Sequence, residues 1–351
     1  MELIYSSVIP VQYPDVSNFQ KTFERQLVAS GEIKIATGYV SEDSLMELKS
    51  IFAHYKKSAT PKACDLIIGM HGREGFTRPQ YEAACSLGQF LSDNRIGCVR
   101  VCTAFKFHGK VYSFLKNQLP HASIVGSSNI SNILGLGAQW EVDTLITETQ
   151  KITDLIGLHE DIARKTTKPI LEYTDVKFID RQDLLEGCSN VEKVSHQELD
   201  RAKHSVTGLT FDIPLKAEAR SNLNAHFGKG REAPTGLIRS RPWYEVEVIV
   251  PLAITTLSGY PPIGETFTVY TDDGWSFKCK VNGQNSKNLR SEGDLQILGR
   301  WIKGRMEDAR VLKVGELVTA EMLQHYGTNH LKLSATNDPR LWLLDFSPKK
   351  I

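Results

Sequence analysis

The sequence predicts two domains in series, an α/β domain followed by a mainly β domain. The chain has 351 residues, more than one hydrophobic core usually serves, and 41% of them are hydrophobic. Helical and strand patterns alternate in the first half, whereas alternating, β-branched runs and hairpin turns dominate the second. We expect the first domain over residues 1–168, a connection over 169–205 and the second domain over 206–351.

The first half alternates between amphipathic helical spacing and short apolar runs. Helices are predicted over residues 17–30, 77–92 and 149–165 and from Ser41 onward, and strands over residues 32–40, 64–70, 98–105, 122–126 and 142–147. The stretch S-E-D-S at Ser41 is a typical helix start, and apolar residues follow it at helical spacing. This alternating order favours a sheet covered by helices.

The connection and the second half have a different pattern. Residues 169–205 are polar with little periodicity, so we expect an irregular connection with short helical turns. Residues 243–251 alternate as a strand does, and residues 266–281 hold two strand runs joined by Asp-Asp-Gly, a hairpin signal. The runs HLKLSA and LWLLDF predict a second hairpin, and one helix is expected around residues 299–307. A β-rich barrel or sandwich with one or two helices is therefore predicted.

Composition and charge narrow the possible classes of protein. No apolar run approaches the roughly 18 residues that a membrane helix needs, and we see no secretory signal. The six cysteines form no C-x-x-C pair, so reduced thiols in a cytoplasmic protein are expected rather than a zinc site. Residues 201–351 carry 21 basic and 16 acidic side chains, whereas residues 1–200 carry 21 and 25. The basic second half is suited to holding a polyanion.

Two short motifs in the first half carry groups that suit phosphodiester chemistry. His108 and Lys110 lie two apart in FKFHGKVY, so on a strand both side chains would face the same side. The stretch Gly126-Ser127-Ser128-Asn129 follows an apolar run. A lysine and an asparagine amide can hold a phosphate, and a neutral imidazole is a competent nucleophile. Either motif alone is usually a surface pair or a turn, but the two in order predict a phosphate site.

A carboxylate is expected to complete this site. Glu141 opens the next predicted strand, and its carboxylate can bond to the far ring nitrogen of His108, which fixes the tautomer and stabilises a charged intermediate. Asp143 is the alternative carboxylate. Ser127 could orient the lysine or the carboxylate, or could contact the phosphate.

The pair His108-x-Lys110 with Gly126-Ser127-x-Asn129 resembles the HKD signature of the phospholipase D superfamily. That superfamily usually has an aspartate five residues after the lysine, where this chain has Leu115, and a shorter gap from the lysine to the glycine. Both departures are similar to those of the nuclease branch that includes BfiI-like restriction enzymes, in which a later glutamate is involved. The catalytic residues that the resemblance implies are His108, Lys110, Ser127, Asn129 and Glu141.

The resemblance also implies a dimer. The chemistry of the superfamily uses two histidines, one that attacks phosphorus and one that protonates the leaving oxygen, whereas this chain has a single motif. We therefore expect a homodimer in which the two copies of His108 face each other across a symmetry axis. The implied reaction passes through a phosphohistidine and needs neither a metal nor a cofactor.

Three looser motifs in the second half resemble the B3 type of DNA-binding domain. They are Asp273-Gly274-x-Ser276, Gly299-Arg300-Trp301-Ile302 and Lys313-Val314-Gly315-Glu316. A nuclease half followed by a B3-like half resembles the NgoFVII and BfiI restriction endonucleases, and the likeness to the NgoFVII type spans most of the chain. It implies a bacterial, cytoplasmic, sequence-specific restriction endonuclease that acts on double-stranded DNA.

B3-like domains grip the major groove with two arms, which the resemblance places at residues 221–242 and 282–290. The first arm is Gly-rich, lacks strand alternation and is expected to be a basic loop, whereas the second is dense in amide side chains. Arginine suits guanine, amides suit adenine, and lysine suits phosphate. The candidate DNA contacts are Arg220, Asn224, Lys229, Arg231, Arg239, Arg241, Asn282, Gln284, Asn285, Lys287, Asn288 and Arg290. Alternatively, both arms are solvated polar loops.

Two other functions remain open at this point. A lipid or other phosphodiester hydrolase of the same superfamily would leave the basic second half unexplained. A non-catalytic DNA-binding regulator predicts loss of His108 or Lys110, and both are present. Some NgoFVII-type enzymes resemble parts of assemblies with an ATP-hydrolysing, helicase-like subunit. Because the sequence has no P-loop, any ATP dependence would come from such a partner.

Overall fold

The computed structural model describes residues 2–5, 17–55, 62–135 and 140–348, which fall into two compact units. Unit 1 comprises Met1–Arg181 and Gly230–Ser240, and unit 2 comprises Gln182–Lys229 and Arg241–Ile351. The chain therefore passes between the units three times. A short segment from the middle of the predicted second domain belongs to the first unit.

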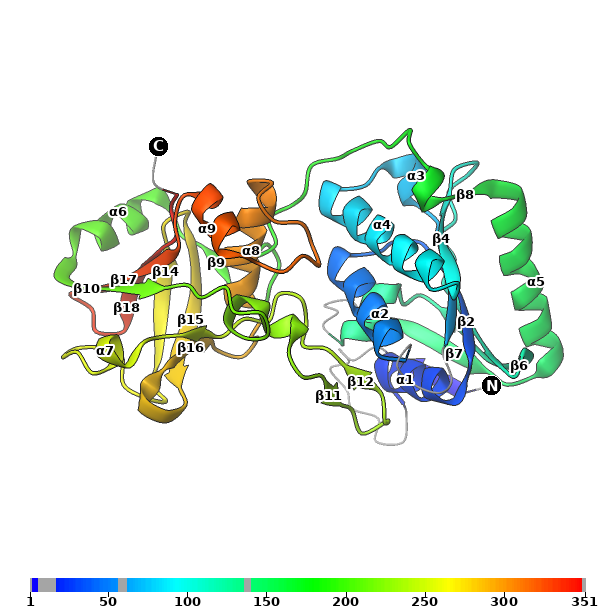
Figure 1. Ribbon diagram of the computed structural model, residues 1–351, viewed down its shortest axis with the longest axis horizontal. Coiled ribbons are helices and arrows are strands. Elements are labelled where there is room, and N and C mark those ends of the chain that lie inside the picture. The colour runs from blue at the N-terminus through cyan, green and yellow to red at the C-terminus, as the bar shows by residue number, and fades with distance from the viewer. Residues whose placement is uncertain (1, 6–16, 56–61, 136–139, 349–351) are drawn as a thin grey trace. The chain divides into compact units, whose positions relative to one another are not determined.

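Unit 1 is built on a mixed sheet in the order β1-β7-β6-β5-β2-β3-β4-β8 (Figure 1). Its strands are β1 (Glu2–Tyr5), β2 (Glu32–Thr37), β3 (Ala63–Ile68), β4 (Gly97–Cys102), β5 (Val111–Lys116), β6 (Leu119–Gly126), β7 (Val142–Ile146) and β8 (Thr167–Pro169). The β2–β3 and β3–β4 pairs are parallel, whereas the remaining neighbours in this sheet are antiparallel.

Helices cover both faces of this sheet (Figure 1). They are α1 (Phe19–Ala29), α2 (Glu42–Tyr55), α3 (His71–Glu74), α4 (Arg78–Asp93), α5 (Thr149–Thr166) and the 3-10 turns η1 (Ile130–Leu134) and η2 (Ile170–Glu172). Figure 1 shows α1, α2 and α4 on one face and α5 on the other. Helix α4 begins where expected because Thr77 and Gln80 form a capping box. The predicted helices and strands of the first half are thus confirmed, with small shifts at their ends.

The strand expected to carry His108 and Lys110 is wrong, because β5 begins only at Val111. The preceding segment instead crosses the end of β3, where the Phe107 N–H donates to the Gly69 carbonyl at 3.1 Å. The Phe107 ring also lies over Gly109, since a Cβ on Gly109 would meet that ring at 2.5 Å. The glycine between the two motif residues therefore packs directly against the Phe107 ring.

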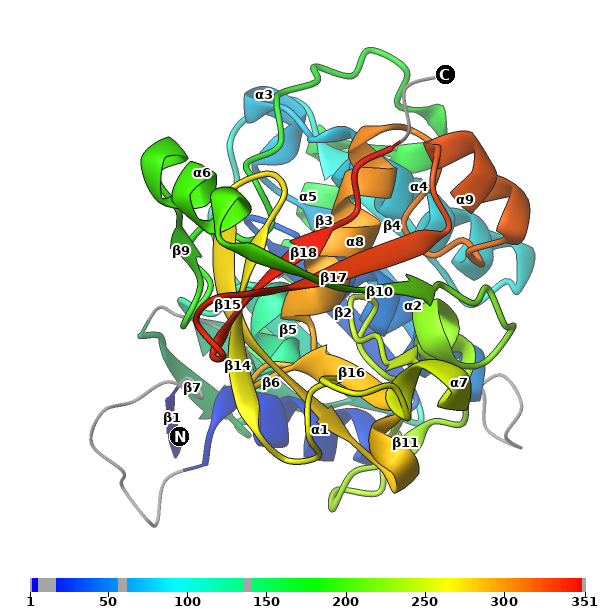
Figure 2. The ribbon, with the colours of Figure 1, turned by 90° about the vertical axis from the view of Figure 1, so that its left-hand side faces the viewer.

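Unit 2 is a sheet in the order β10-β17-β18-β14-β15-β16-β13, with β9 added beside β15. Its strands are β9 (Glu192–Lys193), β10 (Val206–Pro214), β13 (Val248–Ile249), β14 (Thr266–Thr271), β15 (Trp275–Asn282), β16 (Asn288–Ser291), β17 (His330–Thr336) and β18 (Leu341–Asp345). The helices and 3-10 turns are α6 (His196–His204), α7 (Leu252–Thr255), α8 (Ile297–Asp308), α9 (Ala320–Tyr326), η3 (Asn222–Phe227) and η4 (Gln284–Ser286). Figure 2 shows this sheet curling, with β10 and β17 crossing β14 and β15.

The two predicted hairpins and the helix of the second half are confirmed by β14–β15, β17–β18 and α8. The strand expected over residues 243–251 is mostly wrong, since only Val248–Ile249 pairs. Its apolar side chains pack against α8 instead. A Cβ on Gly299 would lie 1.8 Å from the Tyr244 carbonyl oxygen, so helix and segment touch backbone to backbone. In the connection expected to be irregular, α6 forms behind a capping box of Ser195 and Glu198.

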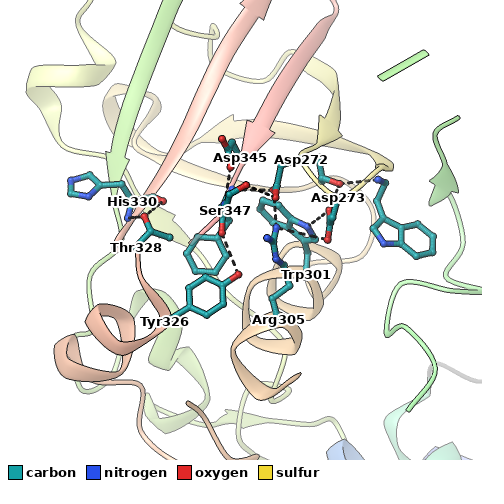
Figure 3. A network of polar contacts seen from close by, with 12 residues as sticks. Asp272, Asp273, Trp301, Arg305, Tyr326, Thr328, His330, Asp345 and Ser347 are labelled. Atoms are coloured by element: carbon teal, nitrogen blue, oxygen red, sulfur yellow. Dashed lines mark hydrogen bonds and ion pairs between the residues drawn. The ribbon is translucent and has the colours of Figure 1, made fainter. Parts of the chain in front are cut away.

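A polar network explains the aspartates of the hairpin turn in unit 2 (Figure 3). Asp273 Oδ1 accepts a hydrogen bond of 2.9 Å from the Trp301 indole, and Asp272 pairs with Arg305 at 2.7 Å. Although burial opposes ionisation, Arg305 holds the pKa of Asp272 below its ordinary value. Two of the three B3-like motifs are thus joined, because the turn and α8 bond directly to each other.

Candidate active site

The candidate site lies at one edge of the unit 1 sheet, where four strand ends meet. In the register, Ala36 at the end of β2 pairs with Val111 at the start of β5. Val111 in turn pairs with Val125 near the end of β6, and Gly126 pairs with Asp143 at the start of β7. Antiparallel pairing therefore brings together the loops that carry both sequence motifs.

His108 and Lys110 meet at this edge. The Lys110 ammonium lies 3.1 Å from His108 Nε2 and donates to the His108 carbonyl oxygen at 2.7 Å. A lysine ammonium only donates, so Nε2 accepts and the ring proton lies on Nδ1. His108 is exposed whereas Lys110 is buried. The geometry thus places the Nε2 atom of the His108 ring against the Lys110 ammonium.

Glu141 lies near Lys110. Burial lowers the pKa of Lys110, and the negative charge of Glu141 opposes that shift. Among the described residues, no hydrogen bond joins Glu141 to the His108 ring. Glu141 therefore acts here on the charge of the lysine.

The alternative carboxylate, Asp143, has a different role. It is 1% exposed and accepts hydrogen bonds from the Ser128 N–H at 3.0 Å and the Ser128 hydroxyl at 2.6 Å. Burial raises its pKa, and both bonds from Ser128 oppose that shift. A Cβ on Gly126 would lie 2.5 Å from Asp143 Cα, so only glycine fits there. Asp143 thus shapes the loop that ends in Asn129.

The other predicted positions at this edge divide between surface and core. Ser127 is exposed, and its hydroxyl accepts from the Val142 N–H at 3.0 Å. Leu115, which holds the place of the superfamily aspartate, is a buried residue of β5. The site is therefore made without a carboxylate at that place.

Sequence reasoning missed the segment that follows β2. Asn129 Oδ1 accepts hydrogen bonds from the Tyr39 N–H at 3.0 Å and from the Thr37 hydroxyl at 3.3 Å. Gly38 lies between His108 and Asn129, because a Cβ there would meet His108 Cδ2 at 3.1 Å and Asn129 Oδ1 at 3.5 Å. The run T-G-Y at the end of a predicted parallel strand could have indicated this position.

Tyr39 continues from this loop to the rim of the site. Its ring meets the His108 ring edge to face at 5.6 Å, and its hydroxyl donates to Glu74 at 2.7 Å. The carboxylate of Glu74 raises the pKa of Tyr39 and also pairs with Lys106 at 2.9 Å. The side chains of Tyr39, Glu74 and Lys106 are therefore linked by polar contacts beside His108.

The candidate DNA contacts that lie in the unit 2 part of the first arm differ in exposure and in bonding. Arg220 and Lys229 are exposed. Asn224 is fully buried, and its amide donates to and accepts from the Val318 backbone at 2.8 Å each. Arg241 pairs with two carboxylates, those of Glu245 and Glu247. Because Asn224 is fully buried with both of its amide atoms bonded, it is not available to DNA.

The rest of the first arm is a hairpin in unit 1, so the expectation of a loop is wrong there. Strands β11 (Arg231–Glu232) and β12 (Ile238–Arg239) pair, and Leu237 is fully buried. Arg239 bonds to Glu24 at 2.8 Å and to Glu47 at 2.5 Å. Burial raises the pKa of Glu47, and Arg239 opposes that shift. Arg231 is exposed on this hairpin.

The second arm remains available at the surface of unit 2. Gln284, Asn285 and Lys287 are exposed around η4, where Asn285 has a φ of 59°. This left-handed residue makes the tight turn that displays the three side chains. Asn282, Asn288 and Arg290 flank the turn and are half-buried.

The described residues hold neither a metal-binding cluster nor a membrane span. Across the described parts of the chain, no group of three or more histidine, cysteine or acidic side chains is placed to hold a metal ion. Within the same residues, no helix combines the length and apolar character of a membrane span.

Comparison with known families defines the class of protein. A family model described as the NgoFVII restriction endonuclease N-terminal PLD domain matches residues 17–170, and one described as the NgoFVII C-terminal B3-like DNA-binding domain matches residues 201–337. The chain is thus a phospholipase D-type nuclease followed by a B3-like DNA-binding domain, and the predicted fold class is confirmed. It belongs to the NgoFVII family of restriction endonucleases.

Solved structures show more distant likeness. The phospholipase D family member Nuc from Salmonella typhimurium is 13% identical over 48% of this chain and 95% of its own, with a TM-score of 0.32. Phosphatidylserine synthase from Haemophilus influenzae Rd KW20 is 12% identical over 50% of this chain and 41% of its own, with a TM-score of 0.33. No curated protein matches the chain.

Proposed function

We propose that this restriction enzyme hydrolyses DNA phosphodiesters at a specific sequence through a covalent phosphohistidine on His108, without a metal ion. The observation that carries the proposal is the meeting of His108, Lys110 and Asn129 at one sheet edge, with the Lys110 ammonium 3.1 Å from His108 Nε2. These are a nucleophile, a cation and an amide donor within reach of a single phosphate.

The reaction has two displacements. The Lys110 ammonium turns from His108 Nε2 to a non-bridging oxygen of the phosphate, and the freed lone pair of Nε2 attacks phosphorus. The bond to one deoxyribose oxygen breaks, and that oxygen takes a proton from a second histidine. Water then attacks the phosphohistidine and gives a proton to this second histidine, the P–N bond breaks, and His108 is restored. Lys110 and the Asn129 amide offset the charge on the non-bridging oxygens, which is the work that a metal performs in other nucleases. Glu141 opposes the lowering of the Lys110 pKa by burial, and Ser127 is retained as a contact to the phosphate or to the lysine.

The second histidine is His108 of another subunit. Two observations support a homodimer formed through unit 1. Only one H-x-K motif in the sequence, that of His108, is followed by a G-S-x-N stretch, whereas the chemistry needs an acid as well as a nucleophile. Large apolar side chains are also exposed near the site, with Trp140 68% and Phe105 41% exposed. Apolar surface of this kind marks protein interfaces.

DNA sequence is read by unit 2. We retain as contacts the exposed or half-buried members of the two arms, which are Arg220, Lys229, Asn282, Gln284, Asn285, Lys287, Asn288 and Arg290, with Arg231 as a further exposed cation on the hairpin. The second arm presents amides suited to adenine beside a lysine suited to phosphate.

The test is digestion of long duplex DNA in EDTA by the purified protein. Discrete fragments, lost in His108→Ala, are expected, together with a 5′- or 3′-phosphoryl adduct that survives alkali and is released by acid. Cleavage that requires Mg²⁺, or that persists in His108→Ala, contradicts the mechanism. Hydrolysis of phospholipid but not of DNA would favour a lipid hydrolase. Cleavage without ATP would exclude dependence on an ATP-hydrolysing partner subunit.

Subunit mixing tests the composite site. When His108→Ala subunits are exchanged into the wild-type protein, each mixed dimer has one histidine and should be inactive. Activity should then fall with the square of the wild-type fraction. A linear fall would mean that each subunit works alone, and the shared site would be refuted.

A further inference from the structure

Thr37, at the end of β2, is a buried threonine that contacts Asn129 of the candidate site. Thr37 is fully buried. Its hydroxyl oxygen accepts from the Ile130 N–H at 3.3 Å and lies 3.3 Å from Asn129 Oδ1 and 3.3 Å from the Tyr39 carbonyl oxygen. One side chain therefore joins the loop after β2 to the loop that carries Asn129, which lies 92 residues later in the chain.

These contacts set the direction of the Asn129 amide. Its oxygen is engaged by the Tyr39 N–H at 3.0 Å and by the Thr37 hydroxyl. Turning the amide over would place an NH₂ group against an N–H donor, so this orientation is favoured. The Nδ2 group of Asn129 consequently faces away from the Tyr39 N–H. It donates to no other described residue, so its N–H bonds can be directed at a phosphate.

Gly38 places the nucleophile against the same support. A Cβ there would lie 3.1 Å from His108 Cδ2, closer than side chains normally approach, and 3.5 Å from Asn129 Oδ1. Because Gly38 has no side chain, the His108 ring and the Asn129 amide can both pack against its backbone. A methyl group would displace the ring by a few tenths of an ångström.

We propose that Thr37 and Gly38 are positioning residues of the nuclease site: Thr37 orients the Asn129 amide toward the scissile phosphate, and Gly38 lets the His108 ring approach that amide. The inference rests on the proposed nuclease function. Both residues are buried, so each acts through its neighbour. A displacement below one ångström is large enough to slow a displacement reaction at phosphorus.

Thr37→Val keeps the shape and removes the hydroxyl, whereas Thr37→Ser restores it. We expect Thr37→Val to lower kcat about 10- to 100-fold with little change in KM, and Thr37→Ser to recover most of the loss. In an Asn129→Ala background, Thr37→Val should have no further effect. Thr22→Val, at another buried threonine in unit 1, is the matched control and should keep wild-type kcat. Gly38→Ala should lower kcat in the same way.

A second readout does not need activity. The side-chain amide NMR signals of Asn129, identified by their loss in Asn129→Ala, should shift in Thr37→Val and return in Thr37→Ser. Unchanged signals, or kcat losses that simply multiply in the double variant, would overturn the positioning role. If the wild-type protein cleaves no DNA while the signals shift as expected, the proposed function fails and the orientation of Asn129 by Thr37 stands.

Discussion

A substitution of Arg239 would show whether this arginine stabilises the fold of unit 1 or contacts DNA. Sequence resemblance places it in a DNA-binding arm, but its guanidinium is paired with Glu24 and Glu47, whose side chains are 7% and 2% exposed. Arg239→Ala leaves two buried carboxylates without their cation, which costs about 3–5 kcal/mol. At roughly 2–4 °C per kcal/mol for a unit of this size, the melting temperature of unit 1 should fall by about 6–20 °C.

Calorimetry at neutral pH measures this fall, and Lys287→Ala, at an exposed arm position, is the control that should melt as wild type. Acid should reduce the loss. Burial already raises the pKa of Glu47, and removing Arg239 raises it further. The folded state then binds the extra proton, so its stability rises as pH falls from that raised pKa toward the carboxylate's ordinary pKa. Wild-type melting together with weakened DNA binding would refute the structural role of Arg239.

Three further outcomes are expected. Gly126→Ala should abolish cleavage and lower the melting temperature of unit 1, because its Cβ would lie 2.5 Å from Asp143 Cα; a wild-type melt would contradict this. Lys287→Ala should weaken DNA binding at all sequences and lower the slope of log affinity against log salt by about 0.9, if Lys287 contacts one phosphate; an unchanged slope would exclude that contact. Burial lowers the pKa of Lys303 to about 7, against the pull of Glu307. Unit 2 should therefore become more stable as pH rises from about 7 toward 10, since the unfolded chain then binds the extra proton, and Lys303→Met should flatten that dependence in calorimetric titrations.

The α/β order of the first half could be predicted because each helix and strand there has its own local pattern. Helix α4 shows this well, since Thr77 and Gln80 cap it in the sequence as they do in the structure. The second half was harder to predict. Alternation over residues 243–251 indicates a strand, but it arises from packing on α8, where Gly299 admits the Tyr244 backbone. Side-chain periodicity records burial, and it does not say whether the partner is a strand or a helix.

The candidate site could likewise be predicted only in part from the sequence. His108, Lys110 and Asn129 could be proposed from residue types alone, because phosphate chemistry restricts which side chains serve. For Thr37 and Gly38, the T-G-Y run could indicate a position at a strand end but not their roles, since these lie in contacts with residues far along the chain. Long-range register creates these contacts, and a single sequence does not encode it in any local pattern.

The pairing of His108 with Lys110 was predicted for a reason that proved wrong, and the actual reason constrains the site more. On a strand, residues two apart would share a face, but the segment is not a strand. The pair forms instead because the Lys110 ammonium turns back to the His108 carbonyl oxygen at 2.7 Å and to the His108 ring nitrogen at 3.1 Å. A shared strand face would only place the two side chains next to each other, whereas these bonds hold the ammonium against the ring. A Cβ on Gly109 would meet the Phe107 ring at 2.5 Å, so a larger residue between the histidine and the lysine would have to displace that ring.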